Sequence, residues 1–384
     1  MRYAVAVSGG VDSMYMAWKC RHLCPLAITV DHGLRPESAD EAKAVGTILR
    51  QWGLDHQIVK VNVPGNGSAL EENARLQRYA AINDVCTARE ISTVLVAHTA
   101  DDQVETFYMR LMRGSSLFGL RGLLPKGHFP MVTPRPLWVE RPLLTTPKQT
   151  IIEEMTEKQL PWFEDKTNHD PSLTHRNSIR SHLTQNPQLR QSLQELHRQV
   201  VEANKMIDGY ATSLAKQVSI TWDWHRGCCI IDGVRETDTE IMTRFLFYTL
   251  YPISSAKLYP WLYTKFEALV RRGLNGTVAN LKFNFSNDRL TVSQAPKPRY
   301  TAGEVTTIDN TPRLYDNRWW VNSPKPMQLV TYNHKIHQQM VSPPLIGVVG
   351  MNGVLAEVYQ GKIVGFPTFT GKSWHPKHNI YSTD

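Results

Sequence analysis

A short apolar run that ends in two glycines places the strongest constraint on how this chain folds. Tyr3 to Val7 is a run of β-branched and apolar residues with the length of a buried parallel strand. The loop Ser8-Gly9-Gly10-Val11-Asp12-Ser13 follows at once, and Met14 to Trp18 is typical of a helix start. Glycines let the backbone turn tightly and approach a ligand, and the first turn of a helix presents unpaired N–H groups. This pattern predicts an anion site with phosphate as the natural anion, although an ordinary strand-to-helix turn would have a similar sequence.

Strands and helices alternate through the first half of the sequence. Three further strands are predicted by apolar runs at 26–30, 56–63 and 93–97, and helical patterns at 38–52 and 69–89 separate them. This alternation predicts an α/β fold with a doubly wound, Rossmann-like parallel sheet. Because 384 residues exceed one ordinary domain, we expect a first domain at 1–185, a linker helix at 186–217, a small α+β domain at 218–295 and a β-rich module of unknown role at 296–384.

Composition narrows the class of protein. A net charge of +8 favours a polyanionic partner. The five cysteines include no C-x-x-C pair, so neither a zinc site nor a disulfide framework is indicated, and a reduced intracellular compartment fits best. We find no apolar stretch of membrane-spanning length and no recognisable signal or transit peptide, so we expect no membrane partner.

Candidate chemical side chains follow the second and fourth predicted strands. Asp31 comes directly after the run at 26–30, and the segment from His98 to Thr106 follows the run at 93–97. Such positions lie where ligands bind in open α/β sheets. Asp102 and Glu105 are three residues apart and would share a helix face, where they can hold Mg²⁺, bind an amine or accept a proton. Acidic residues near a helix start also stabilise the helix dipole, so a structural role stays open.

The glycine loop belongs to neither of the two commonest phosphate-binding motifs. No Gly-Lys-Ser/Thr follows, as in a Walker loop, and the spacing is not G-x-G-x-x-G. Ser8 to Ser13 is instead similar to the loop of N-type ATP pyrophosphatases, which cleave ATP between the α- and β-phosphates. Further strings, in this order, resemble the tRNA(Ile)-lysidine synthetase family: Val30 to Arg35, Ala74 to Tyr79, His98 to Thr106, Arg110 to Ser115, Arg141 to Leu144, Glu164 to Asn168 and Arg176 to Arg180. The resemblance covers about the first 185 residues and departs at Ser116, where the family usually has glycine.

The resemblance implies a reaction on the first anticodon cytidine of tRNA(Ile) with a CAU anticodon. ATP would adenylate the C2 oxygen of the base and release diphosphate, and the ε-amine of free L-lysine would then displace AMP to give lysidine. ATP and Mg²⁺ are the implied cofactors. The implied ATP-binding residues are Ser8, Gly9, Gly10, Val11, Asp12, Ser13, Asp31 and His98, with Asp12 also facing the magnesium.

The resemblance also assigns the second substrate. Asp102 and Glu105 would bind the lysine ammonium and help to remove a proton from it. This help is needed because the ε-ammonium has a pKa of ~10.4 and stays protonated at neutral pH. Arg78 and Arg176 would offset negative charge on the phosphates or on the lysine carboxylate. Taken alone, Arg78 is more typical of a solvated basic helix face. The implied catalytic set is Asp12, Asp102, Glu105 and Arg176.

The second half of the sequence carries weaker signals. Basic residues interleaved with Tyr259, Trp261 and Tyr263 resemble the small tRNA-binding domain of the family, in which aromatic rings would stack on bases. An aromatic core is the alternative. Cys228 and Cys229 are adjacent in a predicted hairpin, so we expect them to be packing residues on opposite strand faces.

Two other functions stay open from the residues. A tRNA thiolase of the same ATP-pyrophosphatase group would need a persulfide or an iron–sulfur cluster, and Cys20, Cys24 and Cys86 form no pair suited to that task. A non-catalytic RNA-binding protein would need neither an intact loop nor an acidic cluster. A lysidine-forming enzyme is required in bacteria and in organelles of bacterial descent. Leu173 to Asn177 is more similar to fungal relatives, which favours a mitochondrial matrix protein, whereas the lack of a recognisable transit peptide argues against it. A bacterial protein would be cytoplasmic, and the sequence predicts no oligomeric state.

Overall fold

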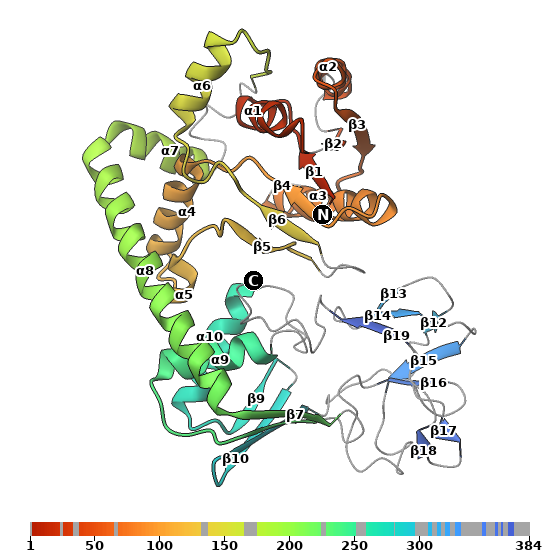
Figure 1. Cartoon of the computed structure of the whole chain (residues 1–384), viewed down its shortest axis with the longest axis vertical. Coiled ribbons are helices and arrows are strands. Elements are labelled where there is room, and N and C mark those ends of the chain that lie inside the picture. Colours follow the sequence, from red (N-terminus) through yellow and green to blue (C-terminus); the bar gives the residue numbers. More distant parts are fainter. Residues whose placement is uncertain are drawn as a thin grey trace. The chain divides into compact units, whose positions relative to one another are not determined.

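The computed structural model describes residues 2–23, 26–33, 38–64, 68–131, 137–164, 175–223, 228–250, 259–279 and 281–295, with short strands after residue 305. The chain divides into two compact units, Met1–Glu202 and Ala203–Asp384 (Figure 1). Several stretches that carried sequence interpretations lie outside the described residues: Cys24, Leu34 and Arg35, 165–168 of the string at Glu164, and Leu173 with Thr174.

A six-stranded sheet forms the centre of the first unit, in the order β3-β2-β1-β4-β6-β5. Its strands are β1 (Tyr3–Ala6), β2 (Leu26–Asp31), β3 (Asp55–Lys60), β4 (Thr93–Leu95), β5 (Lys126–His128) and β6 (Trp138–Glu140). All neighbouring pairs are parallel except β5 with β6. The predicted α/β fold with a mostly parallel sheet is therefore confirmed. The sequence did not predict β5 and β6, and β5 adds an antiparallel edge.

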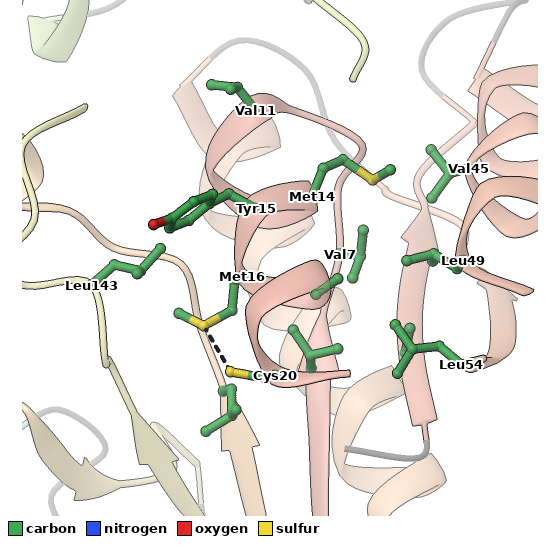
Figure 2. Close-up of a cluster of buried hydrophobic side chains, with 14 of the residues drawn as sticks. Val7, Val11, Met14, Tyr15, Met16, Cys20, Val45, Leu49, Leu54 and Leu143 are labelled. Carbon is green, nitrogen blue, oxygen red and sulfur yellow. Dashed lines mark hydrogen bonds between the residues drawn. The ribbon is translucent and has the colours of Figure 1, made fainter. Parts of the chain in front are cut away.

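Helices cover both faces of this sheet because side chains alternate along each strand. The helices of this unit are α1 (Val11–Cys20), α2 (Ser38–Gln51), α3 (Ser68–Ala88), α4 (Ala100–Met112), α5 (Leu117–Leu120), α6 (Lys148–Glu157) and α7 (His175–Gln185). On one face Val5 and Val7 pack with Met14 of α1 and Leu49 of α2, the cluster drawn in Figure 2. On the other face Ala4 and its neighbours pack against α3.

The strand order determines where a ligand can enter. From β1 the chain runs through β2 to β3 on one side and then returns to β4 on the other side of β1. In open α/β sheets the crevice at such a reversal, outside the carboxyl ends of the strands, is the usual ligand site. The glycine loop after β1 and the segment from His98 to Glu105 after β4 both lie at this crevice.

A long helix, α8 (Pro187–Gln217), follows α7, and its first half packs with α4 and α7 through Leu193 and Val200. The second unit contains an antiparallel five-stranded sheet in the order β7-β8-β11-β10-β9. Its elements are β7 (Ser219–Asp223), β8 (Cys228–Asp232), α9 (Thr239–Leu250), α10 (Tyr259–Arg271), β9 (Gly276–Val278), β10 (Leu281–Ser286) and β11 (Arg289–Gln294). The predicted hairpin around the two adjacent cysteines is present as β7 and β8, and both Cys228 and Cys229 are buried.

The proposed base-stacking role of Tyr263 is wrong. Tyr263 is 1% exposed and packs edge-on against Phe247, while its hydroxyl donates to Glu240. Arg244, one of the basic residues of this region, is fully buried and pairs with Asp208. Both residues belong to a core, the alternative that the sequence left open.

After residue 305 the structure describes short strands only. They are β12 (Thr306–Ile308), β13 (Arg313–Tyr315), β14 (Trp319–Asn322), β15 (Met327–Thr331), β16 (Val348–Gly350), β17 (Val358–Tyr359), β18 (Lys362–Ile363) and β19 (Thr368–Gly371). They pair as β12-β15-β16, β13-β14-β19 and β17-β18. The domain boundaries and the role of 296–384 stay predictions.

Candidate active site

The glycine loop between β1 and α1 has the geometry of a phosphate-binding turn. Gly9 has φ +90°, a conformation that favours glycine, and a Cβ there would crowd Val45 Cγ2 at 3.0 Å. Phe163 N–H donates to Gly9 O at 2.9 Å and holds the turn in place. Gly10 is the N-cap of α1, and no side chain of the described residues caps this helix. The N–H groups of its first turn are therefore able to bind an anion.

Side chains inside the loop fix its shape. Ser13 Oγ accepts from Ser8 N–H at 3.1 Å and donates to Gly10 O at 2.9 Å. Ser13 and Val11 are buried, whereas Ser8 is exposed. Val11 thus contributes its backbone rather than its side chain, and the Ser8 hydroxyl is the one that reaches solvent.

Asp12 lies in the first turn of α1 and has one carboxylate oxygen engaged. Oδ2 accepts from Lys148 Nζ at 3.2 Å, whereas Oδ1 is buried without a hydrogen-bond partner among the described residues. Burial raises the pKa of Asp12, Lys148 opposes this shift, and Asp102 and Asp101 add to it. An orphaned acidic oxygen fits Mg²⁺, which nucleotide sites hold through one or two carboxylates and the phosphates. No group of three or more metal-ligating side chains occurs in the part of the chain that the structure describes.

His98, at the start of the segment after β4, is held in its neutral form. Arg141 Nε donates to His98 Nδ1 at 3.2 Å, which places the remaining ring proton on Nε2. Burial lowers the pKa of His98 to about 4; Asp102 acts in the opposite direction, and Arg141 and Arg176 lower the pKa further. His98 can therefore present a hydrogen-bond donor to a nucleotide or base without adding charge.

Asp102 and Glu105 share one face of α4, as their spacing predicted, and both are bound by arginines of α7. Arg176 donates to Asp102 Oδ1 at 2.5 Å and to Glu105 Oε2 at 2.8 Å. Arg180 donates to Glu105 Oε1 at 2.7 Å and to Oε2 at 3.2 Å. Glu105 is 3% exposed, and its charge raises the pKa of Arg180. A buried carboxylate paired with two guanidinium groups satisfies the requirement that buried charges are paired.

Asp102 also caps α4. Its Oδ2 accepts from Thr99 N–H at 2.7 Å, and Thr99 Oγ1 accepts from Asp102 N–H at 3.3 Å, which together form a capping box. Asp102 therefore caps the helix with Oδ2, while Oδ1 of the same carboxylate binds the cation.

The neighbouring Asp101 connects three helices. Its Oδ2 accepts from the backbone N–H of Lys148 at 2.8 Å, and its Oδ1 accepts from Arg190 of α8 at 2.5 Å. The start of α6 is thereby fixed against the start of α4. This contact positions Lys148 beside the first turn of α1.

Asp31 and Arg78 lie at the end of β2. Asp31 Oδ1 accepts from Gly33 N–H at 2.9 Å. Burial would raise the pKa of Asp31, but the Gly33 hydrogen bond and nearby Ser38, Lys60 and His32 together lower it. Arg78 donates to His32 Nε2 through Nε at 3.3 Å and through a terminal nitrogen at 3.2 Å. In this structure Arg78 therefore contacts a histidine rather than the carboxylates of α4.

The structure brings Asp102, Glu105 and Arg176 into direct contact, and electrostatic coupling links Asp12 and His98 to them. Their functional roles stay proposals. The sequence interpretation did not single out four site residues: Arg141, Lys148, Arg180 and Arg190. Arg141 and Arg180 stood within family-like strings, whereas no pattern marked Lys148 or Arg190.

Comparison with known proteins shows that residues 1–187 match the PP-loop domain family. A tRNA(Ile)-lysidine synthase of Anaplasma marginale (strain St. Maries) is 38% identical over 176 residues, 44% of this chain and 37% of its own length. One from Zymomonas mobilis is 33% identical, covering 54% of this chain and 63% of its own. One from Wolbachia pipientis wMel is 29% identical, covering 82% of this chain and 75% of its own.

These similarities confirm the resemblance that the sequence motifs indicated. The chain spans less than two-thirds of the length of the Anaplasma and Zymomonas relatives. All three relatives are bacterial and give no support to the expected mitochondrial compartment. Among the described residues, no helix is both long and apolar enough to cross a membrane.

Proposed function

We propose that this chain, whose first 187 residues form a PP-loop domain, is an ATP-dependent tRNA(Ile)-lysidine synthase. One observation carries the proposal: a glycine turn at a helix N-terminus lies at the same sheet crevice as a buried acidic cluster. The first feature suits a nucleotide phosphate, and the second suits an amine. The name of the relatives, tRNA(Ile)-lysidine synthase, supports lysidine formation on tRNA(Ile).

In the first step the loop would hold ATP while the C2 oxygen of cytidine attacks the α-phosphate and diphosphate leaves. The N–H groups of Gly10 to Ser13 and the Ser8 hydroxyl would donate to phosphate oxygens, and a helix dipole favours the same negative charge. Neutral His98 would donate from Nε2 to the nucleotide or the target base. Mg²⁺, when bound, neutralises phosphate charge, and Asp12 Oδ1 is the oxygen that fits it.

In the second step the ε-amine of lysine would attack C2 and displace AMP. We place its ammonium beside Asp102 and Glu105, whose carboxylates would attract it and help to remove a proton. Arg176 occupies these carboxylates in the structure, so lysine entry requires Arg176 to turn away from Asp102. Its side chain is 39% exposed, so part of it already contacts solvent. A guanidinium released in this way would pair with a phosphate or with the lysine carboxylate.

The net charge of +8 favours binding of the tRNA phosphates, and we place tRNA binding in the second unit because of the family resemblance. Neither Tyr263 nor Arg244 can contribute, because both are buried. The bacterial relatives favour the cytoplasm of a bacterium as the compartment.

Incorporation of radiolabelled lysine into tRNA(Ile), with ATP present or omitted, tests the proposal. We expect ATP-dependent label in tRNA with a CAU anticodon, and nucleoside mass analysis should identify lysidine. A tRNA(Ile) transcript with a changed first anticodon base is the matched control. Absence of label from the CAU substrate would refute the proposed function.

Thiolation is the competing activity of this enzyme group, and the four cysteines that the structure describes disfavour it. Cys20, Cys86, Cys228 and Cys229 are all buried. Burial raises the pKa of Cys86 to about 12, and it also raises the pKa of Cys20 and Cys229. A persulfide carrier needs an accessible thiolate, which these four side chains do not supply.

A further inference from the structure

The glycine loop would bring ATP to a place where its own residues supply no positive side chain. Ser8 to Ser13 contains neither lysine nor arginine, and Asp12 adds a negative charge. In Walker loops a lysine of the loop reaches the β- and γ-phosphates. A cation that serves the same purpose here must come from another part of the fold.

Lys148 lies where such a cation is needed. Its Nζ is 3.2 Å from Asp12 Oδ2, so its charge lies at the first turn of α1, toward which the phosphates would be drawn. The Lys148 side chain is 41% exposed and that of Asp12 is 25% exposed. A ligand in the loop can therefore approach the amine from solvent.

The backbone of Lys148 is positioned independently of this ion pair. Its N–H donates to Asp101 Oδ2 at 2.8 Å, which fixes the first residue of α6 against α4. A lysine side chain has a flexible four-carbon stem and a compact charge. Nζ can therefore swing from Asp12 to a nearby anion without movement of the helix.

The other cations of the cluster are held more firmly. Arg176 bonds to two carboxylates, and Arg180 makes two bonds to Glu105. Lys148 has a single ion pair, to a carboxylate whose second oxygen is buried without a partner among the described residues. The Asp12–Lys148 pair therefore differs from a saturated structural salt bridge, and a phosphate can displace it at low cost.

We propose that Lys148 is the phosphate-binding lysine of this site and takes the diphosphate portion of ATP. With ATP in the loop, Lys148 would leave Asp12 for the phosphates, and both carboxylate oxygens of Asp12 could then hold Mg²⁺. The diphosphate is the part that departs with the larger charge, so a cation gives most benefit there. This inference rests on the proposed function only in placing ATP at the loop.

Isothermal titration of the full chain with inorganic pyrophosphate and, separately, with AMP, both with Mg²⁺, tests the inference. We expect Lys148→Met to weaken pyrophosphate binding about tenfold or more and AMP binding less than about twofold, because one charge-assisted contact is lost to pyrophosphate alone. Lys148→Arg should retain most of the pyrophosphate affinity. Lys19→Met is the matched control, because Lys19 also pairs α1 with α6, through Glu154 at 3.4 Å, but at the far end of α1.

The outcomes separate the two hypotheses. Unchanged pyrophosphate affinity in Lys148→Met, or equal losses for pyrophosphate and AMP, would overturn the role of Lys148. Selective loss of pyrophosphate binding in a protein that transfers no lysine to tRNA would support Lys148 and refute the proposed reaction. If the wild-type protein binds no pyrophosphate, the phosphate-binding roles of the glycine loop and of Lys148 would both be refuted.

Discussion

Glu105→Gln removes one negative charge from between two arginines while it keeps the shape of the side chain. Glu105 is 3% exposed and accepts three charge-assisted hydrogen bonds, from Arg176 Nε, Arg180 Nε and the terminal nitrogen of Arg180. The amide keeps one acceptor oxygen. Its NH₂ group would face a guanidinium donor, so at least one arginine loses its partner.

The expected cost follows from this geometry. Removal of one partner from a fully buried ion pair costs about 3–5 kcal/mol. The Arg176 and Arg180 side chains are 39% and 36% exposed, so water replaces part of what each loses. With this discount we expect about 2–3 kcal/mol less stability. For a unit of this size that lowers Tm by roughly 4–12 °C.

Scanning calorimetry at neutral pH measures this change. Glu154→Gln is the matched control, because Glu154 makes a partly exposed ion pair with Lys19 at 3.4 Å, and we expect a shift below about 2 °C there. Equal shifts in the two variants would refute the view of Glu105 as a buried charge centre. Glu105→Gln should also raise the KM for lysine more than the KM for ATP. A change in the ATP requirement alone would place the amine elsewhere and leave the stability argument intact.

Asp12→Ala should abolish ATP-to-pyrophosphate turnover with an unchanged circular dichroism spectrum, and full turnover would contradict the assigned metal and phosphate role. Because burial lowers the pKa of His98 from 6.5 to about 4, the unfolded chain takes up the proton first as pH falls. Stability should thus fall between about pH 6.5 and 4, by about 3 kcal/mol from this group. Urea unfolding should show a smaller fall in His98→Gln, and an equal fall in that variant would contradict the assignment. Truncation after residue 217 should weaken tRNA binding and reduce its salt dependence in filter-binding assays. Unchanged affinity would show that the residues after 217 do not contribute to tRNA binding.

The loop and its two flanking elements were predictable because their signals are local. Alternate residues of β1 face opposite layers, with Val5 in one core cluster and Ala4 in the other, so the strand is apolar along its whole length. The positive φ angle of the turn favours glycine at position 9. The spacing of Asp102 and Glu105 likewise sets their shared helix face without help from the rest of the chain.

Long-range partners were not predictable from the residues. Lys148 meets Asp12 across 136 positions, and Arg190 meets Asp101 across 89. The sequence around a single basic residue near a helix start does not indicate which distant carboxylate it will contact. The edge strand β5, Lys126–His128, is short and polar and carries no period-two signal. The burial of Arg244 was not predictable for a different reason: charge predicts exposure, and only the hydrogen-bond acceptors around this side chain explain its burial.

Asp102 shows why the structural and chemical interpretations of this site could not be separated from the sequence. A helix N-terminus needs an acceptor for its orphan N–H groups, and a binding site for an amine needs a carboxylate at the same strand end. The structure satisfies both needs with one side chain: Oδ2 accepts from Thr99, and Oδ1 accepts from Arg176. Because the capping box fixes the rotation of the carboxylate, Oδ1 is held in place whether Arg176 or a substrate ammonium occupies it. The cap therefore prepares the site, and exchange of one cation for another at Oδ1 needs no rearrangement of α4.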